Sequence, residues 1–295
     1  MDGATNSNPA KYTVEDDTIT LANAEKTGYT FLGWYSDSSM TSEVKQIDTS
    51  AAVNVELWAK WEVIEYTATF RNSDGVVDTV KFTVEDKTIT EPKVPERNGY
   101  TGAWETYELT ADDLTINAVY TPVTYTITYT NTKDAENVNA TQFTVESETI
   151  KLADLSVNGY TFNGWYNGDE KVTEITTGTY GNIALEARWT PVVYTITYEY
   201  DDTVGNLPDG VTLKTSYTIE DAFDFASLNC NSVGYNFAGW FTEKELGTGE
   251  QVTGIALGTT GNKTYYAQWG LETYSITFEN VEGAVNTNPD TYTIE

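Results

Sequence analysis

The sequence has 295 residues and a formal net charge of −29, with 16 lysine or arginine residues, 45 aspartate or glutamate residues and no histidine. So acidic a chain repels phosphate backbones and anionic lipid headgroups, and we expect no nucleic-acid partner and no membrane insertion. The absence of histidine excludes Ser-His and Cys-His catalytic arrangements. The single cysteine, Cys230, can form no intrachain disulfide and no CxxC site, and we expect a buried, inert thiol.

No apolar stretch is long enough for a membrane-spanning helix, and the N-terminus lacks the basic and apolar regions of a signal peptide. Repeat sequence follows Met1 at once. We interpret this as the start of a fragment of a longer protein.

Several repeats are predicted to open on a strand in which Tyr, Ile, Ala or Phe alternates with Thr or Ser. This period of two indicates one buried face. The strands are residues 66–70, 125–129, 194–198 and 274–278. A polar turn follows, and a second strand ends in an aromatic-Thr-(Val/Ile)-Glu signature at residues 12–15, 82–85, 143–146, 217–220 and 292–295.

The next segment carries apolar residues two apart, such as Ile150 and Leu152. This spacing leaves an extended crossover and one or two helical turns both open. In the second repeat, Pro92 and Pro95 disfavour a helix.

The chain is organised around a Gly-Tyr turn that leads into an aromatic strand, at residues 28–35, 99–104, 159–166 and 234–241. We expect the first glycine to supply a backbone angle that other residues resist. The closing strand ends on a large residue, an alanine and an aromatic residue at alternate positions, in residues 57–61, 116–120, 185–189 and 265–269. The recurring alanine predicts a place where a ring or another backbone comes close.

Four residues always separate the closing aromatic residue from the next opening tyrosine: residues 62–65, 121–124, 190–193 and 270–273. Four residues span at most about 14 Å, so adjacent repeats cannot tumble freely. With a diameter of about 25 Å for a compact domain of this size, we expect a rod on the order of 100 Å.

We therefore predict a mostly β protein, a tandem array with five segments. Residues 1–61 are a partial repeat that lacks its first strand, and residues 66–120 are a shortened, divergent repeat. Residues 125–189 and 194–269 are further repeats, and residues 274–295 are the opening hairpin of another. We call these the first to fourth repeats and the terminal hairpin.

The opening strand, the aromatic-Thr-Val-Glu signature, the Gly-Tyr-Thr-Phe-x-Gly-Trp-Tyr block and the closing Leu-x-Ala-x-Trp recur in order. Together they resemble the Listeria–Bacteroides repeat of the internalin B-repeat type, found in Gram-positive and gut bacterial surface proteins. The resemblance covers nearly the whole chain and is weakest in the second repeat. It implies small β-grasp-like units in tandem, secreted to the cell surface as part of a large anchored protein. It implies no catalytic or cofactor residues.

Three groups of residues were considered as sites. The recurring Glu15, Glu85, Glu146 and Glu220 are interpreted as strand-end residues that cap a turn. Asp201, Asp202 and Asp209 share a loop and carry Ca²⁺-type oxygen ligands, but they match neither the EF-hand nor the RTX spacing, and the equivalent loops carry fewer acidic residues, so we interpret them as a solvated turn. Trp58, Phe241 and Tyr266 are candidates for sugar stacking, although Trp58 aligns with Asn117 and Glu186, so the site does not recur.

A self-made Lys–Asn isopeptide bond is not supported at Lys60, which aligns with Val119, Arg188 and Gln268. The sequence thus predicts a non-enzymatic, stiff spacer of a secreted, wall-associated bacterial adhesin. Two alternatives stay open. The repeats themselves bind a host or bacterial protein, for instance by strand addition at an exposed edge. Or residues 274–295 complete residues 11–61 of another molecule, giving head-to-tail self-association.

Overall fold

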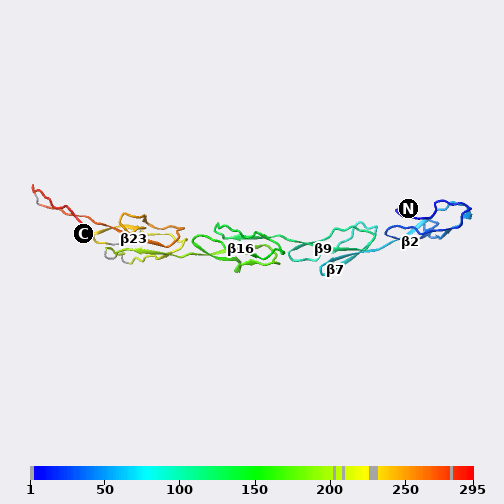
Figure 1. The fold of residues 1–295 in the computed structure, drawn as a ribbon, viewed down its shortest axis with the longest axis horizontal. Coiled ribbons are helices and arrows are strands. Elements are labelled where there is room, and N and C mark those ends of the chain that lie inside the picture. The colour runs from blue at the N-terminus through cyan, green and yellow to red at the C-terminus, as the bar shows by residue number, and fades with distance from the viewer. Residues whose placement is uncertain (1–2, 202–203, 208–209, 226–231, 280–281) are drawn as a thin grey trace. The chain divides into compact units, whose positions relative to one another are not determined.

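The computed structural model describes residues 3–201, 204–207, 210–225, 232–279 and 282–295 (Figure 1). Cys230 lies outside these residues. The chain divides into two compact units. The first holds residues 1–124, 144–146 and 178–180, and the second holds residues 125–143, 147–177 and 181–295. Within the described residues the regular elements are strands, apart from one turn of 3-10 helix, η1 (Thr49–Ala51). The prediction of a mostly β protein is confirmed.

In the first repeat, a three-stranded antiparallel sheet has the order β3-β2-β5. Beside it lies a two-stranded ribbon, β1-β4. The bounds are β1 Ile19–Thr20, β2 Tyr29–Tyr35, β3 Glu43–Val44, β4 Gln46–Ile47 and β5 Trp58–Val63.

The second repeat forms a four-stranded sheet in the order β7-β6-β9-β8. Its two central strands, β6 and β9, run parallel, and the outer pairs are antiparallel. The bounds are β6 Tyr66–Asn72, β7 Gly75–Phe82, β8 Tyr100–Trp104 and β9 Leu114–Pro122. The described residues between β7 and β8 hold no strand, and this stretch contains Pro92 and Pro95, which cannot donate to a ladder.

The third and fourth repeats each form a five-stranded sheet, in the orders β11-β10-β16-β13-β14 and β18-β17-β23-β20-β21. Each adds a ribbon, β12-β15 or β19-β22, and the terminal hairpin pairs β24 with β25. The bounds in the third repeat are β10 Tyr125–Thr130, β11 Gln142–Phe143, β12 Ile150–Lys151, β13 Tyr160–Asn167, β14 Glu170–Val172, β15 Glu174–Ile175 and β16 Ile183–Pro191. The bounds in the fourth repeat are β17 Tyr194–Glu199, β18 Ser216–Tyr217, β19 Phe223–Asp224, β20 Tyr235–Phe241, β21 Gln251–Val252, β22 Gly254–Ile255 and β23 Lys263–Leu271. Those in the terminal hairpin are β24 Tyr274–Ser275 and β25 Thr291–Tyr292.

The centre of each complete sheet is the parallel pair made by the opening and closing strands. In the third repeat, Ile127 lies opposite Ile183 and Tyr129 opposite Leu185. Parallel strands need a long crossover, so the remaining strands of the repeat lie between these two in the chain. The segment left open by the sequence is extended, because Ile150 pairs with Ile175 in the ribbon.

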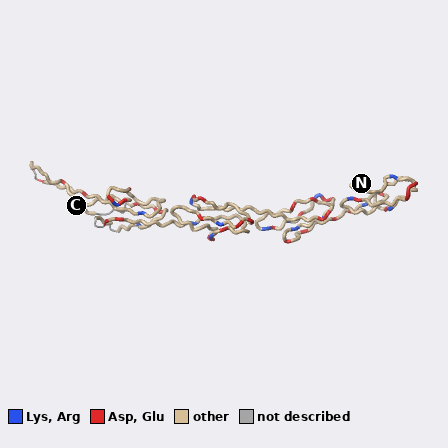
Figure 2. The backbone as a smooth tube through the Cα atoms, viewed as in Figure 1, with Lys and Arg blue, Asp and Glu red and all other residues tan. Residues whose placement is uncertain are grey.

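Aspartate and glutamate are spread along the whole chain rather than gathered in one repeat (Figure 2). Most of these residues lie in the turns and loops between the strands. β10, for example, contains none, and it exposes Thr126 and Thr128 on either side of the buried Ile127.

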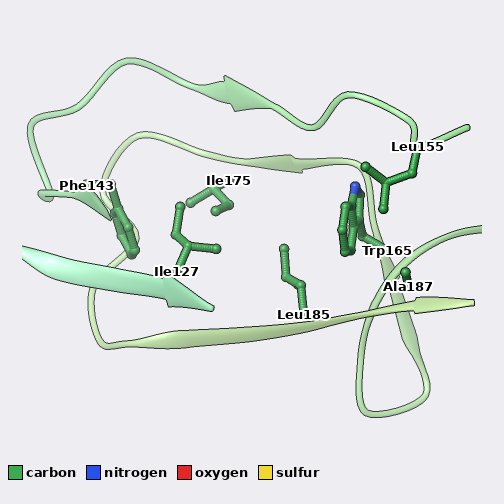
Figure 3. Close-up of a cluster of buried hydrophobic side chains, with 7 residues drawn as sticks. All are labelled: Ile127, Phe143, Leu155, Trp165, Ile175, Leu185 and Ala187. Atoms are coloured by element: carbon green, nitrogen blue, oxygen red, sulfur yellow. The ribbon is translucent and has the colours of Figure 1, made fainter. Parts of the chain in front are cut away.

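The core of the third repeat lies between the sheet and the ribbon. Figure 3 shows its buried side chains gathered there: Ile127, Phe143, Leu155, Trp165, Ile175, Leu185 and Ala187. Trp165 is 1% exposed, and its indole Nε1 donates a hydrogen bond to the carbonyl oxygen of Ala153 at 2.9 Å. Equivalent hydrogen bonds run from the indole Nε1 of Trp34 to the carbonyl oxygen of Ala22 and from that of Trp104 to the carbonyl oxygen of Pro92, each at 2.8 Å.

The recurring alanine lies directly across the ladder from the recurring tryptophan. The register pairs are Trp34 with Ala59, Trp104 with Ala118, Trp165 with Ala187, and Trp240 with Ala267. Directly opposite residues of an antiparallel pair have neighbouring side chains on the same face, so the predicted close approach of a ring is confirmed. Ala187 is fully buried.

We expect Ala187→Leu to lower the free energy of unfolding by about 1–3 kcal/mol, because the added methyl groups overpack a filled core. Ala184→Leu is the matched control: it lies on the same strand, and its side chain is exposed. Guanidinium titration of both variants, followed by circular dichroism, measures the difference. Equal losses in the two variants would contradict the packing argument.

Candidate functional site: the joint between consecutive repeats

One contact recurs at every joint between consecutive repeats. The glycine of the Gly-Tyr turn packs against the Val or Ile of the next Thr-(Val/Ile)-Glu turn. The four pairs are Gly28 with Val84, Gly99 with Val145, Gly159 with Ile219 and Gly234 with Ile294. Each pair lies within one of the two compact units. A Cβ on any of these glycines would overlap the facing side chain.

These glycines are needed for a second reason. Their φ angles are +80°, +80°, +83° and +84°, a left-handed conformation that residues with a Cβ resist. The predicted special backbone angle is confirmed. Glycine therefore both turns the chain and leaves room for the neighbouring repeat.

The tyrosine after each glycine hydrogen-bonds to the glutamate of the next repeat. Each hydroxyl donates to a carboxylate oxygen: Tyr29 to Glu85 at 2.8 Å, Tyr100 to Glu146 at 2.9 Å, Tyr160 to Glu220 at 2.9 Å and Tyr235 to Glu295 at 2.6 Å. The recurring glutamate is thus one half of a bond between consecutive repeats. We call this bond, together with the glycine contact, the joint contact.

The linking residues are also tied back to the turn. A backbone N–H in each link donates to the carbonyl oxygen of the same glycine: Ile64 to Gly28, Val123 to Gly99, Val192 to Gly159 and Glu272 to Gly234, at 2.8–2.9 Å. The four-residue link therefore starts in a fixed direction at every joint.

The turn that presents the glutamate is capped by other side chains. In the second repeat, the Thr83 Oγ1 accepts from the backbone N–H of Glu85 at 3.2 Å, and Asp86 accepts from the N–H of Thr83 at 2.7 Å. The expectation that the glutamates cap this turn is wrong, because threonine and aspartate already satisfy it. The Glu85 carboxylate is left to reach across to Tyr29.

The hydrogen bond to Glu146, followed by partial desolvation, raises the pKa of the Tyr100 hydroxyl above its usual value of 10.0. The bond to Glu295 raises the pKa of Tyr235 in the same way.

Three of the tyrosine rings of the joint contact also have a cation at 4.0–4.1 Å from the ring centre: Lys26 over Tyr29, Arg97 over Tyr100 and Lys133 over Tyr160.

The other candidate residues do not form a shared site. Of the aspartates considered for calcium, Asp202 and Asp209 lie outside the described residues, and the described part of the chain holds no cluster of three or more metal-ligating side chains. Phe241 and Tyr266 are register partners on β20 and β23, and Trp58 pairs with Tyr35 at the equivalent position of the first repeat. Trp58, Phe241 and Tyr266 are half-buried. In the third repeat this position pairs Tyr166 with Glu186, so the aromatic pair is present in the first and fourth repeats but not in the third.

Sequence reasoning singled out both halves of the joint contact but did not pair them. The available signal was the constant four-residue link, which brings each Gly-Tyr turn near the next Thr-(Val/Ile)-Glu turn. Among the described residues, no helix has the length and apolar character needed to span a bilayer.

Four segments of the chain match the Listeria-Bacteroides repeat domain: residues 1–60, 66–122, 125–188 and 194–268. The resemblance seen in the sequence is thereby confirmed. A related protein from Evansella cellulosilytica, provisionally named a membrane protein, is 28% identical over 266 residues, covering 83% of this chain and 39% of that protein. A provisionally named Gly-rich membrane protein of the same organism is 25% identical over 280 residues, covering 88% of this chain and 31% of that protein.

Internalin H of Listeria monocytogenes is 38% identical over 79 residues, which cover 26% of this chain and 14% of that protein. The chain thus spans well under half the length of each of these relatives.

We expect Gly159→Ala to destabilise the chain by about 1–3 kcal/mol more than Gly181→Ala. Both glycines have positive φ, +83° and +93°, so both variants carry the cost of a left-handed alanine. Only at Gly159 does the new Cβ meet another repeat, through Ile219, since nothing lies within 4 Å of the Gly181 position. Denaturant midpoints measure both losses; indistinguishable values would show that the contact adds nothing.

The joint contact should weaken at high pH. Because the folded pKa of Tyr100 and Tyr235 lies above the ordinary value of 10.0, their stabilisation is fully present below that pH and is lost as the pH rises through the raised pKa. Thermal unfolding midpoints, recorded from neutral pH to about pH 11, should fall above pH 10 in the native chain. The fall should be shallower in a Tyr100→Phe, Tyr235→Phe chain, and identical slopes would contradict the assignment.

Proposed function

The chain belongs to the Listeria-Bacteroides repeat domain family, and we propose that it is a non-catalytic spacer within a bacterial cell-surface protein. The observation that carries the proposal is the recurrence of one joint contact at four places along the chain. A repeat that binds its neighbour through the same residues each time serves to continue an array. Catalysis has no comparable support among the described residues.

We propose that the joints make the array stiff. Each link has four residues, which span at most about 14 Å. The glycine contact and the backbone bond to the glycine carbonyl oppose rotation about the link, and the tyrosine–glutamate bond lies at a second point of each joint. Equivalent joints in series propagate one geometry, and for repeats about 25 Å across this supports a rod on the order of 100 Å.

We further propose that each complete repeat is a β-grasp-like unit. The supporting feature is the order of the five-stranded sheet, in which the opening and closing strands form a central parallel pair with one hairpin on each side. The second repeat keeps this central pair with four strands.

The proposed setting is extracellular and wall-associated, as part of an adhesin. The related proteins carry the names of membrane proteins and of an internalin, which supports a place in the cell envelope. The net charge of −29 suits a long surface molecule, since neighbouring copies repel one another and stay soluble.

Small-angle X-ray scattering on the dilute chain tests the spacer. We expect a maximum dimension on the order of 100 Å with the profile of a rod. The matched control carries a flexible Gly-Ser insertion within the link at residues 190–193, which separates the repeats without touching either core. Its scattering should become that of a bent, flexible chain. A compact particle from the native chain would overturn the spacer, and equal flexibility in both chains would overturn the stiff joint.

A further inference from the structure

The chain enters and leaves each complete repeat through one pair of neighbouring strands. The opening and closing strands are β6 and β9 in the second repeat, β10 and β16 in the third, and β17 and β23 in the fourth. Each pair is parallel and shares four register positions. Every other strand of the repeat lies between these two in the chain. Tension along the chain therefore reaches this pair first.

The links deliver that tension with almost no slack. β9 ends at Pro122 and β10 begins at Tyr125, and β16 ends at Pro191 and β17 begins at Tyr194. Only two residues lie between consecutive strands, and the first of them is already held by a backbone hydrogen bond to a glycine of the joint contact. A pull thus passes from each closing strand almost directly to the next opening strand.

The parallel arrangement decides how the pair meets the pull. In the third repeat, Ile127 lies opposite Ile183 near the two strand starts, and the arrows that carry Ile127 and Leu185 point the same way (Figure 3). A pull on the start of β10 and on the end of β16 slides the strands past each other. Because the bonds of a parallel pair are evenly spaced, sliding loads them together, whereas separating the two strand starts breaks them in turn.

A recurring side chain adds a bond at the end where tension enters the opening strand. The residue just before each closing strand accepts, through Oδ1, a hydrogen bond from the backbone N–H of the second residue of the opening strand. The pairs are Asp113 with Thr67 at 2.7 Å, Asn182 with Thr126 at 3.0 Å and Asn262 with Thr195 at 3.0 Å. The parallel register begins one residue later in each repeat, so this bond extends the ladder toward the load.

The third repeat is tied at the far end of the pair as well. Asn131 directly follows β10, and its Nδ2 donates a hydrogen bond to the carbonyl oxygen of Ala187 at 2.8 Å. The carbonyl oxygen of Asn131 accepts a second bond from the indole Nε1 of Trp189 at 2.8 Å. In the fourth repeat, the equivalent indole nitrogen of Trp269 is buried without a hydrogen-bond partner in the described part of the chain. The third repeat should therefore resist sliding better than the fourth.

The core opposes the same movement. In the third repeat, Ile127 is 3% exposed, and the ring centre of Tyr129 lies 4.8 Å from that of Trp165. The same ring pair recurs as Phe70 with Trp104 at 4.8 Å and as Tyr198 with Trp240 at 5.1 Å. Sliding of the opening strand must carry these buried side chains out of their packed positions.

We propose that the parallel pair of opening and closing strands is a mechanical clamp, and that each complete repeat bears tension along the chain. The hairpins and ribbons of the repeat lie off the path of the load and are stretched only after the clamp gives way. This function goes beyond that of a spacer, because a spacer needs a fixed length, whereas a clamp needs resistance to a pull. It depends neither on a rod shape nor on stiff joints.

Single-molecule force spectroscopy on the third repeat of the full chain tests the clamp. Thr124→Cys and Val193→Cys place handles at two exposed positions that flank the repeat, and Cys230→Ala removes the native thiol. A pull through these handles loads β10 and β16 in the sliding direction. Unfolding should be a single step that releases about 240 Å of chain, less the folded distance between the handles.

The matched control moves one handle. Thr124→Cys with Ala184→Cys, also exposed, pulls on the two strand starts and peels the ladder from that end. Because four residue pairs share the load in sliding and break in turn in peeling, we expect sliding to need about two- to fourfold more force. Equal forces in the two directions would overturn the clamp.

A second pair of variants tests the bond at the loaded end. With the sliding handles, Asn182→Ala should shorten the lifetime at constant force about fivefold, the effect of one hydrogen bond on the unfolding rate. Asn163→Ala is the control: it removes the bond from Nδ2 to Thr190 Oγ1 at 2.8 Å, which joins β13 to β16 and lies outside the clamp. It should leave the lifetime unchanged.

The length released in each pull reports that the variant was folded beforehand. Equal lifetimes of the Asn182→Ala and Asn163→Ala chains would overturn the assignment of the load to the β10–β16 pair. Scattering measures shape and pulling measures resistance, so failure of the spacer and failure of the clamp are distinguishable.

Discussion

The structure depends on one pairing, the parallel ladder between the opening and closing strands of each repeat. It supplies the centre of every complete sheet and much of the core, as Ile127 and Leu185 do in the third repeat. Since parallel strands cannot be joined by a tight turn, everything else in the repeat must lie between them. The next opening strand begins only four residues after the closing aromatic residue, so the same pairing fixes where the following repeat starts.

The joint contact follows from that short link. It uses a glycine because the position needs both a left-handed backbone and an absent side chain, as at Gly159 against Ile219. The tyrosine–glutamate bond beside it is exposed, and such a bond is weak on its own in water. It recurs beside each of the four links.

The repeats depart from one another where the sequence departs. The second repeat has no ribbon, because only residues 105–113 separate β8 from β9 and no segment corresponding to β4 or β15 is present to pair with residues 89–90. The second repeat nevertheless keeps the parallel pair of β6 and β9 at the centre of its sheet. The central pairing thus persists where an outer ribbon is lost.

The sequence by itself determined the strands, the turns and the small residues. A period of two shows which side of a strand is buried, the recurring glycine indicated a left-handed turn, and the recurring alanine indicated a close ring. Only the tertiary structure decided which ring approaches the alanine: Trp165 is the register partner of Ala187. It also decided that Tyr160 hydrogen-bonds to Glu220, 60 residues away. Local pattern sets the direction of a side chain, but the partner it meets depends on contacts between segments far apart in the chain.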